Sequence, residues 1–199
     1  MTQEIVSVEF VFGKKHPSLK SELNLFWKQV GKLYNQEMTE HKNLTAVSNQ
    51  TNITINPNTV TSLKREPAAI ARDEKGCIIG IVFVTLTKVE IDSDNSEYVY
   101  FQRMFTLSQK RQFRISNQLY SAFIIHFKKA INERDPRADY LMAENANPGL
   151  RRPSMRRYFF RHGFRMLGTN YLGYEIWRIK LETKEQNIDA KRISPRKDE

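Results

Sequence analysis

The chain has 199 residues, of which 40% are apolar and 11% aromatic, which is enough for one compact domain with a substantial core. Its only cysteine, Cys77, excludes a disulfide framework and a cysteine-based metal site. The four histidines show no metal-ligand spacing, so we expect no metal. The first residues lack the pattern of a signal peptide, and no apolar run approaches the roughly 20 residues that cross a bilayer. We therefore expect a soluble, cytoplasmic protein without a membrane partner.

Positive charge is concentrated in one part of the chain. The formal net charge is +10, and the span 102–165 holds 14 Lys and Arg against four acids, which accounts for the whole excess. A localised basic field of this kind favours a polyanionic ligand.

The N-terminal third predicts a strand, a helix and a loop. Apolar residues alternate over 4–12 and indicate a strand, which Gly13 ends. Pro17 suits the first turn of a helix, and the apolar face that follows extends this helix to about Met38. The span 40–64 is rich in Asn and Thr, which favour turns. We expect a long surface loop there, with a loop over a binding cleft as the alternative.

A hairpin is predicted next. Residues 68–72 and 77–87 form its strands, and the turn at 73–76 has Gly76 at the position that needs positive φ. The second strand is apolar and β-branched, which indicates a central strand that is buried on both faces. Gly80 interrupts it and indicates a bulge or a close approach of another backbone.

The span 98–129 is the one around which the rest of the chain is organised. Residues 98–107 predict an aromatic strand. On one side of its pleat lie Val99, Phe101, Arg103, Phe105 and Leu107. A basic polar turn follows at 108–114, and the helical period begins at Ile115. A strand that ends in a basic loop and opens a helix directs free backbone N–H groups and the positive helix end at one point. This geometry binds phosphate.

The remainder predicts a strand at 140–144, a loop at 145–149, a basic helix at 150–162 closed by Gly163, and strands at 164–167 and 171–181. Residues 182–199 have almost no apolar content and predict a disordered tail outside a domain of residues 1–181. The order is therefore β-α-loop-β-β-β-α-β-α-β-β. It predicts an α/β (α+β) fold with a mixed sheet in one domain.

Three segments carry a family resemblance. They are the hairpin RDEKGCIIGIVFV, the loop and helix start FTLSQKRQFRISNQL, and the segment ENANPGL…RRYFFRHGF. They resemble the second and third strands, the acyl-CoA pyrophosphate loop, and the Asn-containing loop, helix and Gly-Phe end of the GCN5-related N-acetyltransferase (GNAT) superfamily. The resemblance covers about residues 66–181. It implies a GNAT-like N-acyltransferase that uses acetyl-CoA or another acyl-CoA and an amine acceptor of unspecified class.

The pyrophosphate loop departs from the family pattern. Arg111 keeps the leading Arg, but Gln112, Arg114 and Ser116 stand where the family has glycine or a small residue. Glycine lets backbone approach a phosphate closely, so these side chains either block the diphosphate or bind it, with Arg114 as the binding group. The resemblance implies a cofactor site made of Phe105, Leu107, Arg111, Gln112, Phe113, Arg114, Ile115, Ser116 and Asn147.

Acyl transfer from a thioester needs a donor for the developing oxyanion, a base for the amine and an acid for the thiolate. Backbone at 104–107 is the candidate donor. Glu144, at the end of a predicted strand beside the cleft, is the candidate base, and an ion pair with a nearby arginine is the alternative role for it. Glu97 is the second choice of base. Tyr158 is the candidate acid or a core aromatic. Asn145 and Asn147 are candidates to bind the cofactor amides, or turn formers.

Two faces of the predicted helix 150–162 are partly basic. Its candidate polyanion-binding residues are Arg151, Arg152, Arg156, Arg157 and Arg161. Arginines interleaved with aromatic residues grip phosphates and stack on bases, and a solvated basic face is the alternative. Two functions stay open: an acyl-CoA-dependent N-acyltransferase, and a nucleic-acid-directed protein on the same fold that modifies or binds DNA or RNA. The oligomeric state is not indicated.

Overall fold

A computed structural model describes residues 6–14, 17–45, 60–90, 96–107, 113–170 and 173–182, without the side chains at 37–45, 60, 90 and 113. The strands are β1 Ser7–Phe10, β2 Val60–Arg72, β3 Ile78–Glu90, β4 Ser96–Thr106, β5 Ala138–Asn145, β6 Arg165–Thr169 and β7 Glu175–Lys180. The helices are α1 Pro17–Thr45, α2 Phe113–Lys129, the short 3₁₀ helix η3 Pro148–Arg151 and α3 Pro153–Arg161. This is the element order expected from the sequence.

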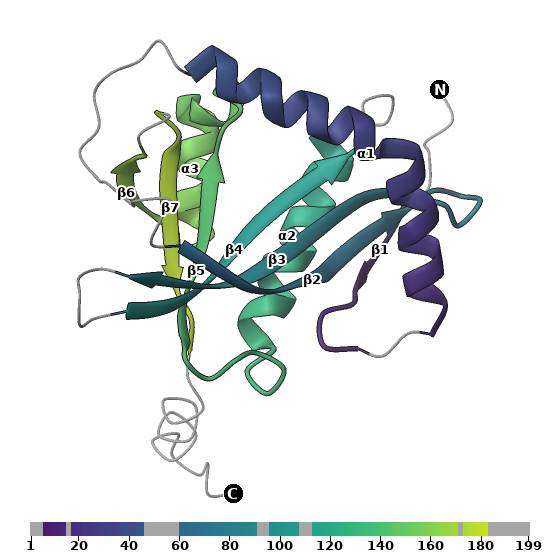
Figure 1. Ribbon diagram of the computed structural model, residues 1–199, viewed down its shortest axis with the longest axis horizontal. Coiled ribbons are helices and arrows are strands. Elements are labelled where there is room, and N and C mark those ends of the chain that lie inside the picture. Colours follow the sequence, from purple (N-terminus) through teal and green to yellow (C-terminus); the bar gives the residue numbers. More distant parts are fainter. Residues whose placement is uncertain are drawn as a thin grey trace, which may run out of the picture.

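The strands form one sheet in the order β1-β2-β3-β4-β5-β7-β6 (Figure 1). Each neighbouring pair is antiparallel except β4 and β5, which are parallel and are connected through α2. The expected single α/β domain with a mixed sheet is confirmed.

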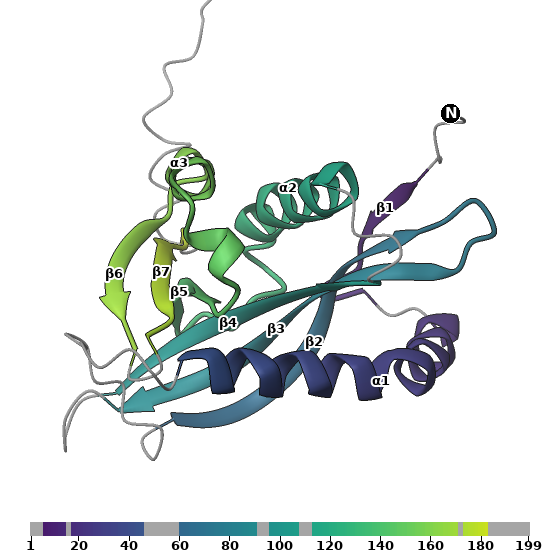
Figure 2. The same cartoon turned by 90° about the horizontal axis from the view of Figure 1, so that it is seen from above.

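Helices cover both faces of the sheet (Figure 2). Helix α1 lies on one face, and α2 and α3 lie on the other. The core under α2 and α3 includes Leu119, Phe123, Phe127, Phe159 and Trp177. The core under α1 includes Phe26, Val30, Ile70, Ile81 and Phe105. Each face of the sheet therefore buries its own apolar layer.

Alternation along β4 assigns its polar residues to these two layers. Phe105 packs in the α1 core and Tyr100 in the α2 core. Successive strand residues point to opposite faces, so Arg103 lies on the α1 side and Gln102 on the α2 side. The hydrogen bond from Gln102 to Tyr120 of α2 agrees with this assignment.

Two expected boundaries near the long loop are wrong. Helix α1 continues to Thr45, beyond the expected end near Met38, and β2 begins at Val60 instead of residue 68. Residues 60–67 pair with β3 between Phe83 and Val89, and this pairing outweighs the turn preference of the polar sequence. Residues 40–45 and 60–64 therefore do not form the loop expected over 40–64, and residues 46–59 lie outside the described residues.

The helix expected over 150–162 is also divided. Asn147 caps η3 with its side chain, and α3 begins afresh at Pro153. Proline lacks the N–H that a continuing helix would need, but its fixed φ suits a first turn. The expected helix is thus two short helical segments joined at Arg152.

Gly80 determines how closely α2 approaches the sheet. A Cβ atom there would lie 3.0 Å from Thr106 Cγ2 and 3.1 Å from Leu119 Cδ2. The register of β2 on β3 also shifts beside it, between Ala71 and Arg72. The bulge expected at Gly80 therefore occurs, and the atoms that crowd this position belong to side chains and not to another backbone. The turn before it has Gly76 at φ 78°, as expected.

Some predicted segments lie outside the described residues. They are the turn residues 108–112, with Arg111 and Gln112, and the tail from residue 183 onward. Among the described helices, none is both long enough and apolar enough to cross a membrane. The described part of the chain also has no cluster of three His, Cys, Asp or Glu side chains that could hold a metal ion.

Candidate active site

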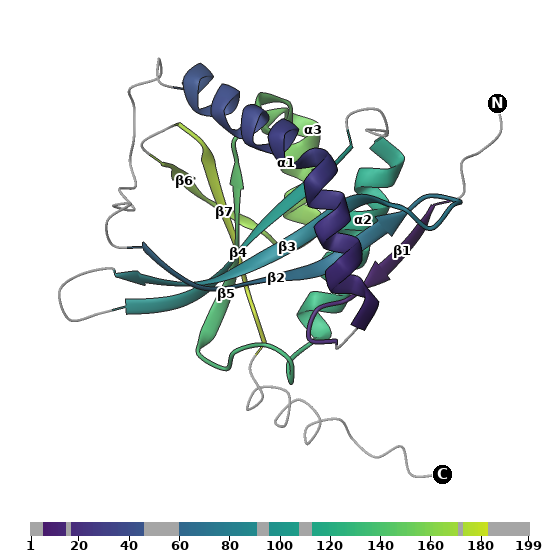
Figure 3. The ribbon, with the colours of Figure 1, turned by 45° about the vertical axis from the view of Figure 1, so that its right-hand side comes forward.

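The parallel strands β4 and β5 separate toward their C-terminal ends (Figure 3). Their mutual pairing ends at Gln102 and Ala143. Beyond that point β4 stays paired with β3 as far as Thr106, and β5 stays paired with β7 as far as Asn145. The β3–β4 register has no shift, so the sheet opens by divergence of whole strands and not by a bulge in β4.

A cavity of about 430 Å³ occupies this opening. Its walls come from α1, β4, α2, β5 and the segment of η3 and α3. Its polar side chains are Tyr34, Gln102, Arg103, Thr106, Ser116, Asn117, Tyr120, Glu144, Asn145, Asn147 and Tyr158. An enclosed space with apolar walls and a few convergent polar groups is the usual form of a small-molecule site.

Two buried polar atoms in this cavity have no hydrogen-bond partner among the described residues. They are Gln102 Oε1 and Asn145 Nδ2, on side chains that are 5% and 2% exposed. Gln102 donates through Nε2 to the Tyr120 hydroxyl, which leaves its oxygen for another donor. A buried polar group without a partner costs about 1–3 kcal/mol. One acceptor and one donor without a partner therefore lie buried in side chains that line the cavity.

Tyr158 lies in the wall of the cavity on the α2 side. Its hydroxyl is 3.1 Å from Ser121 Oγ of α2. Burial raises the pKa of the Tyr158 hydroxyl, against the hydrogen bond with Ser121 and the charge of Arg161, which lower it. Tyr158 therefore keeps its proton at neutral pH and can donate it. Its ring also packs 6.0 Å from the ring of Tyr120, so it is at once a wall aromatic and a candidate acid.

Glu144 lies on the opposite, α1 side of the opening. Its Oε2 accepts a hydrogen bond of 2.8 Å from Arg103 Nη2, and its Oε1 accepts one from Asn170 Nδ2. The backbone N–H of Asn170 donates to the carbonyl oxygen of Tyr174, and the backbone N–H of Tyr174 donates to Asn170 Oδ1. The ion pair that was the alternative interpretation of Glu144 is thus present, and the carboxylate also lines the cavity.

The side chains of the predicted cofactor site lie in different parts of the structure. Phe105 packs under α1, where its ring is 5.5 Å from Tyr34, and Ile115 is buried in the α2 core. Leu107 is partly buried between both cores, and Arg114 is exposed at the start of α2. Ser116 lines the cavity. The side chains of Phe105, Leu107 and Ile115 belong to the core. We therefore still predict that these three residues contact the cofactor through their backbone groups.

Asn147 and Phe113 complete the predicted cofactor set. Asn147 lines the cavity, but its Oδ1 accepts a hydrogen bond of 2.8 Å from the backbone N–H of Gly149. This is the turn-forming role that was the alternative for Asn147. The side chain of Phe113, with Arg111 and Gln112, lies outside the described residues.

The arginines of the predicted basic helix do not form one surface. Arg156 donates through Nε and Nη2 to Glu175, a carboxylate that is 1% exposed and also accepts from Trp177 Nε1. Arg151 has buried nitrogens, whereas Arg152, Arg157 and Arg161 are exposed. Arg156 therefore connects α3 to β7 although its own side chain is 47% exposed, so four of the five predicted polyanion ligands are exposed.

Sequence reasoning missed Gln102, Tyr120 and Asn170. Gln102 had a signal, since it is a polar residue inside an aromatic strand on the side opposite to the chosen face. In the sequence, Tyr120 fits the apolar pattern of the predicted helix and is not distinguished from its core positions. No local pattern marks Asn170, which reaches Glu144 only because β6 and β7 fold back beside β5.

No family model and no curated protein matches the sequence. The structure is similar to a GNAT-family acetyltransferase from Streptococcus pneumoniae, with 13% identity, TM-score 0.47, and coverage of 89% of this chain and 100% of the other. It is also similar to a spermidine N-acetyltransferase chimera from Vibrio cholerae, with 11% identity, TM-score 0.40, and coverage of 92% and 98%. A GNAT phosphinothricin acetyltransferase from Sinorhizobium meliloti in complex with acetyl-CoA is matched at 16% identity and TM-score 0.40. That match covers 59% of this chain and 62% of the other.

The sheet has one parallel pair, β4 and β5, within an otherwise antiparallel strand order. This pair makes the sheet mixed, as expected from the order of the elements.

Proposed function

We propose that the chain is an N-acyltransferase that moves an acyl group from acetyl-CoA or another acyl-CoA to an amine. The observation that carries this proposal is the pair of buried amide atoms without partners, Gln102 Oε1 and Asn145 Nδ2, in the opening between β4 and β5. The fold adds to this only by analogy, since one fold supports many functions.

The residues of the cavity fit the acyl-bearing arm of coenzyme A. That arm contains secondary amides, and each amide has one N–H donor and one carbonyl acceptor. The acceptor on Gln102 and the donor on Asn145 match such groups, and Ser116 and Asn117 add polar side chains from the first turns of α2. Arg114 is exposed at the start of α2, and we expect its guanidinium to contact the diphosphate. When bound, acyl-CoA supplies the acyl group in activated form, as a thioester.

The candidate base and the candidate acid lie on opposite faces of the opening. On the α1 side, each oxygen of Glu144 accepts one hydrogen bond and keeps a further lone pair, so the carboxylate can take a proton from an acceptor ammonium. On the α2 side, the Tyr158 hydroxyl holds a proton because burial raises its pKa. A base on one face and an acid on the other is what acyl transfer to an amine requires.

Binding and turnover test this function together. Titration calorimetry with acetyl-CoA should show a single site, and free thiol should be released faster when primary amines are added than with water alone. The absence of heat at near-millimolar acetyl-CoA would overturn the proposal.

A nucleic-acid-directed protein is the second candidate. Arg152, Arg157 and Arg161 are exposed on α3, and Arg165 lies over the ring of Phe160, which is 49% exposed. Arginines beside an exposed ring can contact phosphates and stack on bases. Gel shifts with single-stranded and duplex DNA at two salt concentrations test this candidate. Binding without salt dependence, or no binding, would contradict it.

A further inference from the structure

A second groove opens beside the cavity on the α1 side of the sheet. Its volume is about 430 Å³, and its walls come from α1, β2, β3 and β4. Tyr34 and Arg103 line both the groove and the cavity. The two spaces therefore adjoin, and a molecule that lies in the groove can extend to Glu144, the hydrogen-bond partner of Arg103.

Arg65 is the cation in this groove whose charge is not balanced by a described carboxylate. Its Cζ lies 3.6 Å from the ring centroid of Phe83 and 5.6 Å from that of Trp27. Among the described residues it forms no ion pair. By contrast, Lys64 pairs with Glu66 at 2.9 Å, and Arg103 pairs with Glu144.

Stacking on Phe83 leaves Arg65 ready for an anion. A guanidinium that lies over a ring uses its flat face, and its N–H donors remain at the edge, in the fork that matches a carboxylate or a phosphate. Burial lowers the pKa of Arg65; Tyr34 opposes this, and the nearby charge of Arg103 lowers it further. An anion in the groove would offset both the lost hydration and the repulsion between the two arginines.

We propose that this groove binds an acidic group, a carboxylate or a phosphate, on the amine acceptor, and that Arg65 is the residue that recognises it. The inference rests on the proposed function, which places the acceptor amine at Glu144. Two strand spacings, about 10 Å, separate β2 from β4, so several bonds must lie between the amine and the anion. A polyamine is disfavoured, because its second ammonium would meet Arg65 and Arg103.

The fluorescence of Trp27 reports the groove without any need for turnover. The chain has two tryptophans, and Trp177 is 0% exposed in the core, so a ligand near Arg65 changes the emission of Trp27. The probes are a matched series: ε-aminohexanoate, aminohexyl phosphate and hexamethylenediamine. Wild type should bind at least one of the two anions and not the diamine, and Trp27→Phe should abolish the signal. No anion binding at millimolar concentrations would overturn the proposal.

Arg65→Gln and Lys64→Gln form a matched pair of variants. Both remove one positive charge from neighbouring residues of β2, but the side chain of Lys64 is 65% exposed and already paired with Glu66. Arg65→Gln should weaken anion binding about tenfold or more, since charge-assisted bonds are lost, while Lys64→Gln should leave it nearly unchanged. An equal loss of anion affinity in the two variants would mean that the overall positive charge of the groove attracts the anion, and it would overturn the role of Arg65. Unchanged circular dichroism and melting temperature show that the variants are folded.

Turnover separates this proposal from the proposed function. With acetyl-CoA, wild type should acetylate the anionic amines in preference to the diamine, and Arg65→Glu should reverse this order. Acetylation without such a preference would contradict the anion site and support the acyltransferase. Arg65-dependent anion binding without acetylation of any amine would support the anion site and contradict the acyltransferase. The better of the two anions identifies the group as carboxylate or phosphate.

Discussion

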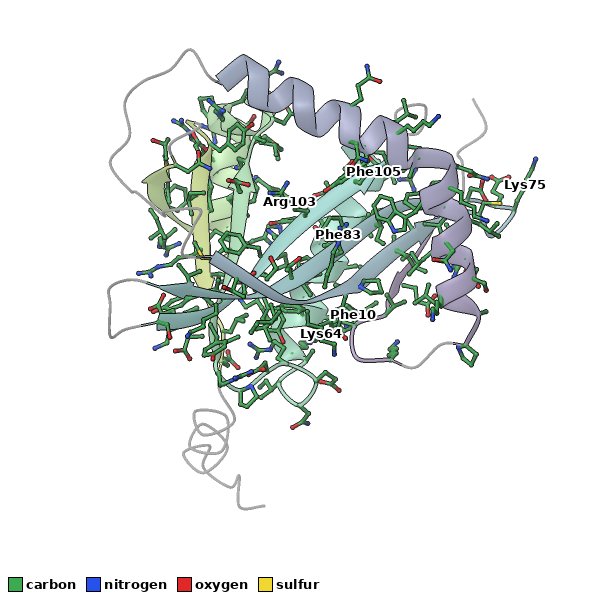
Figure 4. The ribbon with its side chains drawn as sticks, in the orientation of Figure 1. Phe10, Lys64, Lys75, Phe83, Arg103 and Phe105 are labelled. Atoms are coloured by element: carbon green, nitrogen blue, oxygen red, sulfur yellow. The ribbon has the colours of Figure 1, made fainter. Side chains whose placement is uncertain are left out.

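Arg103 of β4 and Glu144 of β5 form a hydrogen-bonded ion pair across the opening in the sheet, with 2.8 Å between Nη2 and Oε2. At these positions the two strands no longer pair through their backbones, so the side chains connect strands that have separated. Figure 4 shows Arg103 between the diverging strands, near Phe83 and Phe105. The pair stands where the cavity and the groove meet, because Arg103 lines both spaces and Glu144 lines the cavity.

Glu144→Gln tests the carboxylate as the base. The amide keeps the shape of the side chain but cannot take a proton, so the acetylation rate should fall by about 100-fold or more. Affinity for acetyl-CoA should not change. Asp139→Asn, at an exposed position of the same strand, is the matched control and should keep wild-type activity. A wild-type rate in Glu144→Gln would restrict the residue to its structural pair with Arg103.

Asn145→Leu should weaken acetyl-CoA binding without lowering the stability of the fold. The side chain is buried, and its Nδ2 has no partner among the described residues, so an apolar residue of similar size should leave the melting temperature unchanged or raise it. The same change should weaken acetyl-CoA several-fold in calorimetry, because the donor for the cofactor amide is gone. Unchanged affinity would contradict the placement of the cofactor in this cavity.

The combined change Arg111→Ala and Arg114→Ala tests the arginine version of the phosphate loop. Affinity for acetyl-CoA should fall more than tenfold, since charge-assisted bonds contribute about 1.5–3 kcal/mol each. S-acetyl-N-acetylcysteamine has the thioester but no diphosphate and is the matched ligand. Its reaction rate should be the same in the variant and in wild type, and an equal loss with both ligands would place the effect elsewhere.

Arg156→Met should destabilise the fold through the carboxylate it leaves behind. Glu175 is 1% exposed and, among the described side chains, would keep only the indole N–H of Trp177 as a partner. Allowing for the partly exposed arginine, we expect a loss of about 1–3 kcal/mol in urea denaturation. Arg157→Met, at the exposed neighbouring position, should change stability little. Equal effects of the two changes would contradict a structural role for the Arg156–Glu175 pair.

His162 should make the fold less stable in mild acid. Burial lowers the pKa of its imidazole, and the charges of Lys128 and Arg161 lower it further. A folded-state pKa below the unfolded value of about 6.5 means that the unfolded chain takes up the proton first. The stability due to neutral His162 is therefore complete above about pH 6.5 and is lost as the pH falls through the folded-state pKa. The difference in unfolding free energy between wild type and His162→Gln should shrink over that range. A constant difference would contradict the shift.

Elements with strong periodicity were predictable from the sequence. The helix from Ile115, the strand with Arg103 and Phe105 on one side, and the turn at Gly76 follow from side-chain period and glycine chemistry, which are local. Boundaries set by pairing were not predictable. The first half of β2 has a turn-forming composition and becomes a strand only because β3 lies beside it.

Individual site residues were predictable only where a local irregularity marked them. Glu144 at the end of its strand and Tyr158 in its helix were found, and the structure brings both to the cavity. The partners Arg103, Asn170 and Ser121 come from other elements, at separations of 41, 26 and 37 residues along the chain. In the sequence, nothing distinguishes Arg156 from the other arginines of its helix. Its hydrogen bond to the buried Glu175 of β7 is visible only in the structure.

The sequence by itself determined the order of elements, the fold class and the concentration of positive charge between residues 102 and 165. These depend on composition and on period along the chain. Only the tertiary structure decided that β4 and β5 part after Gln102 and Ala143, that Gln102 and Asn145 keep polar atoms for a ligand, and that Arg65 lies over Phe83. These depend on which strands meet and how far they stay together, and pairing between distant segments leaves no trace in local period.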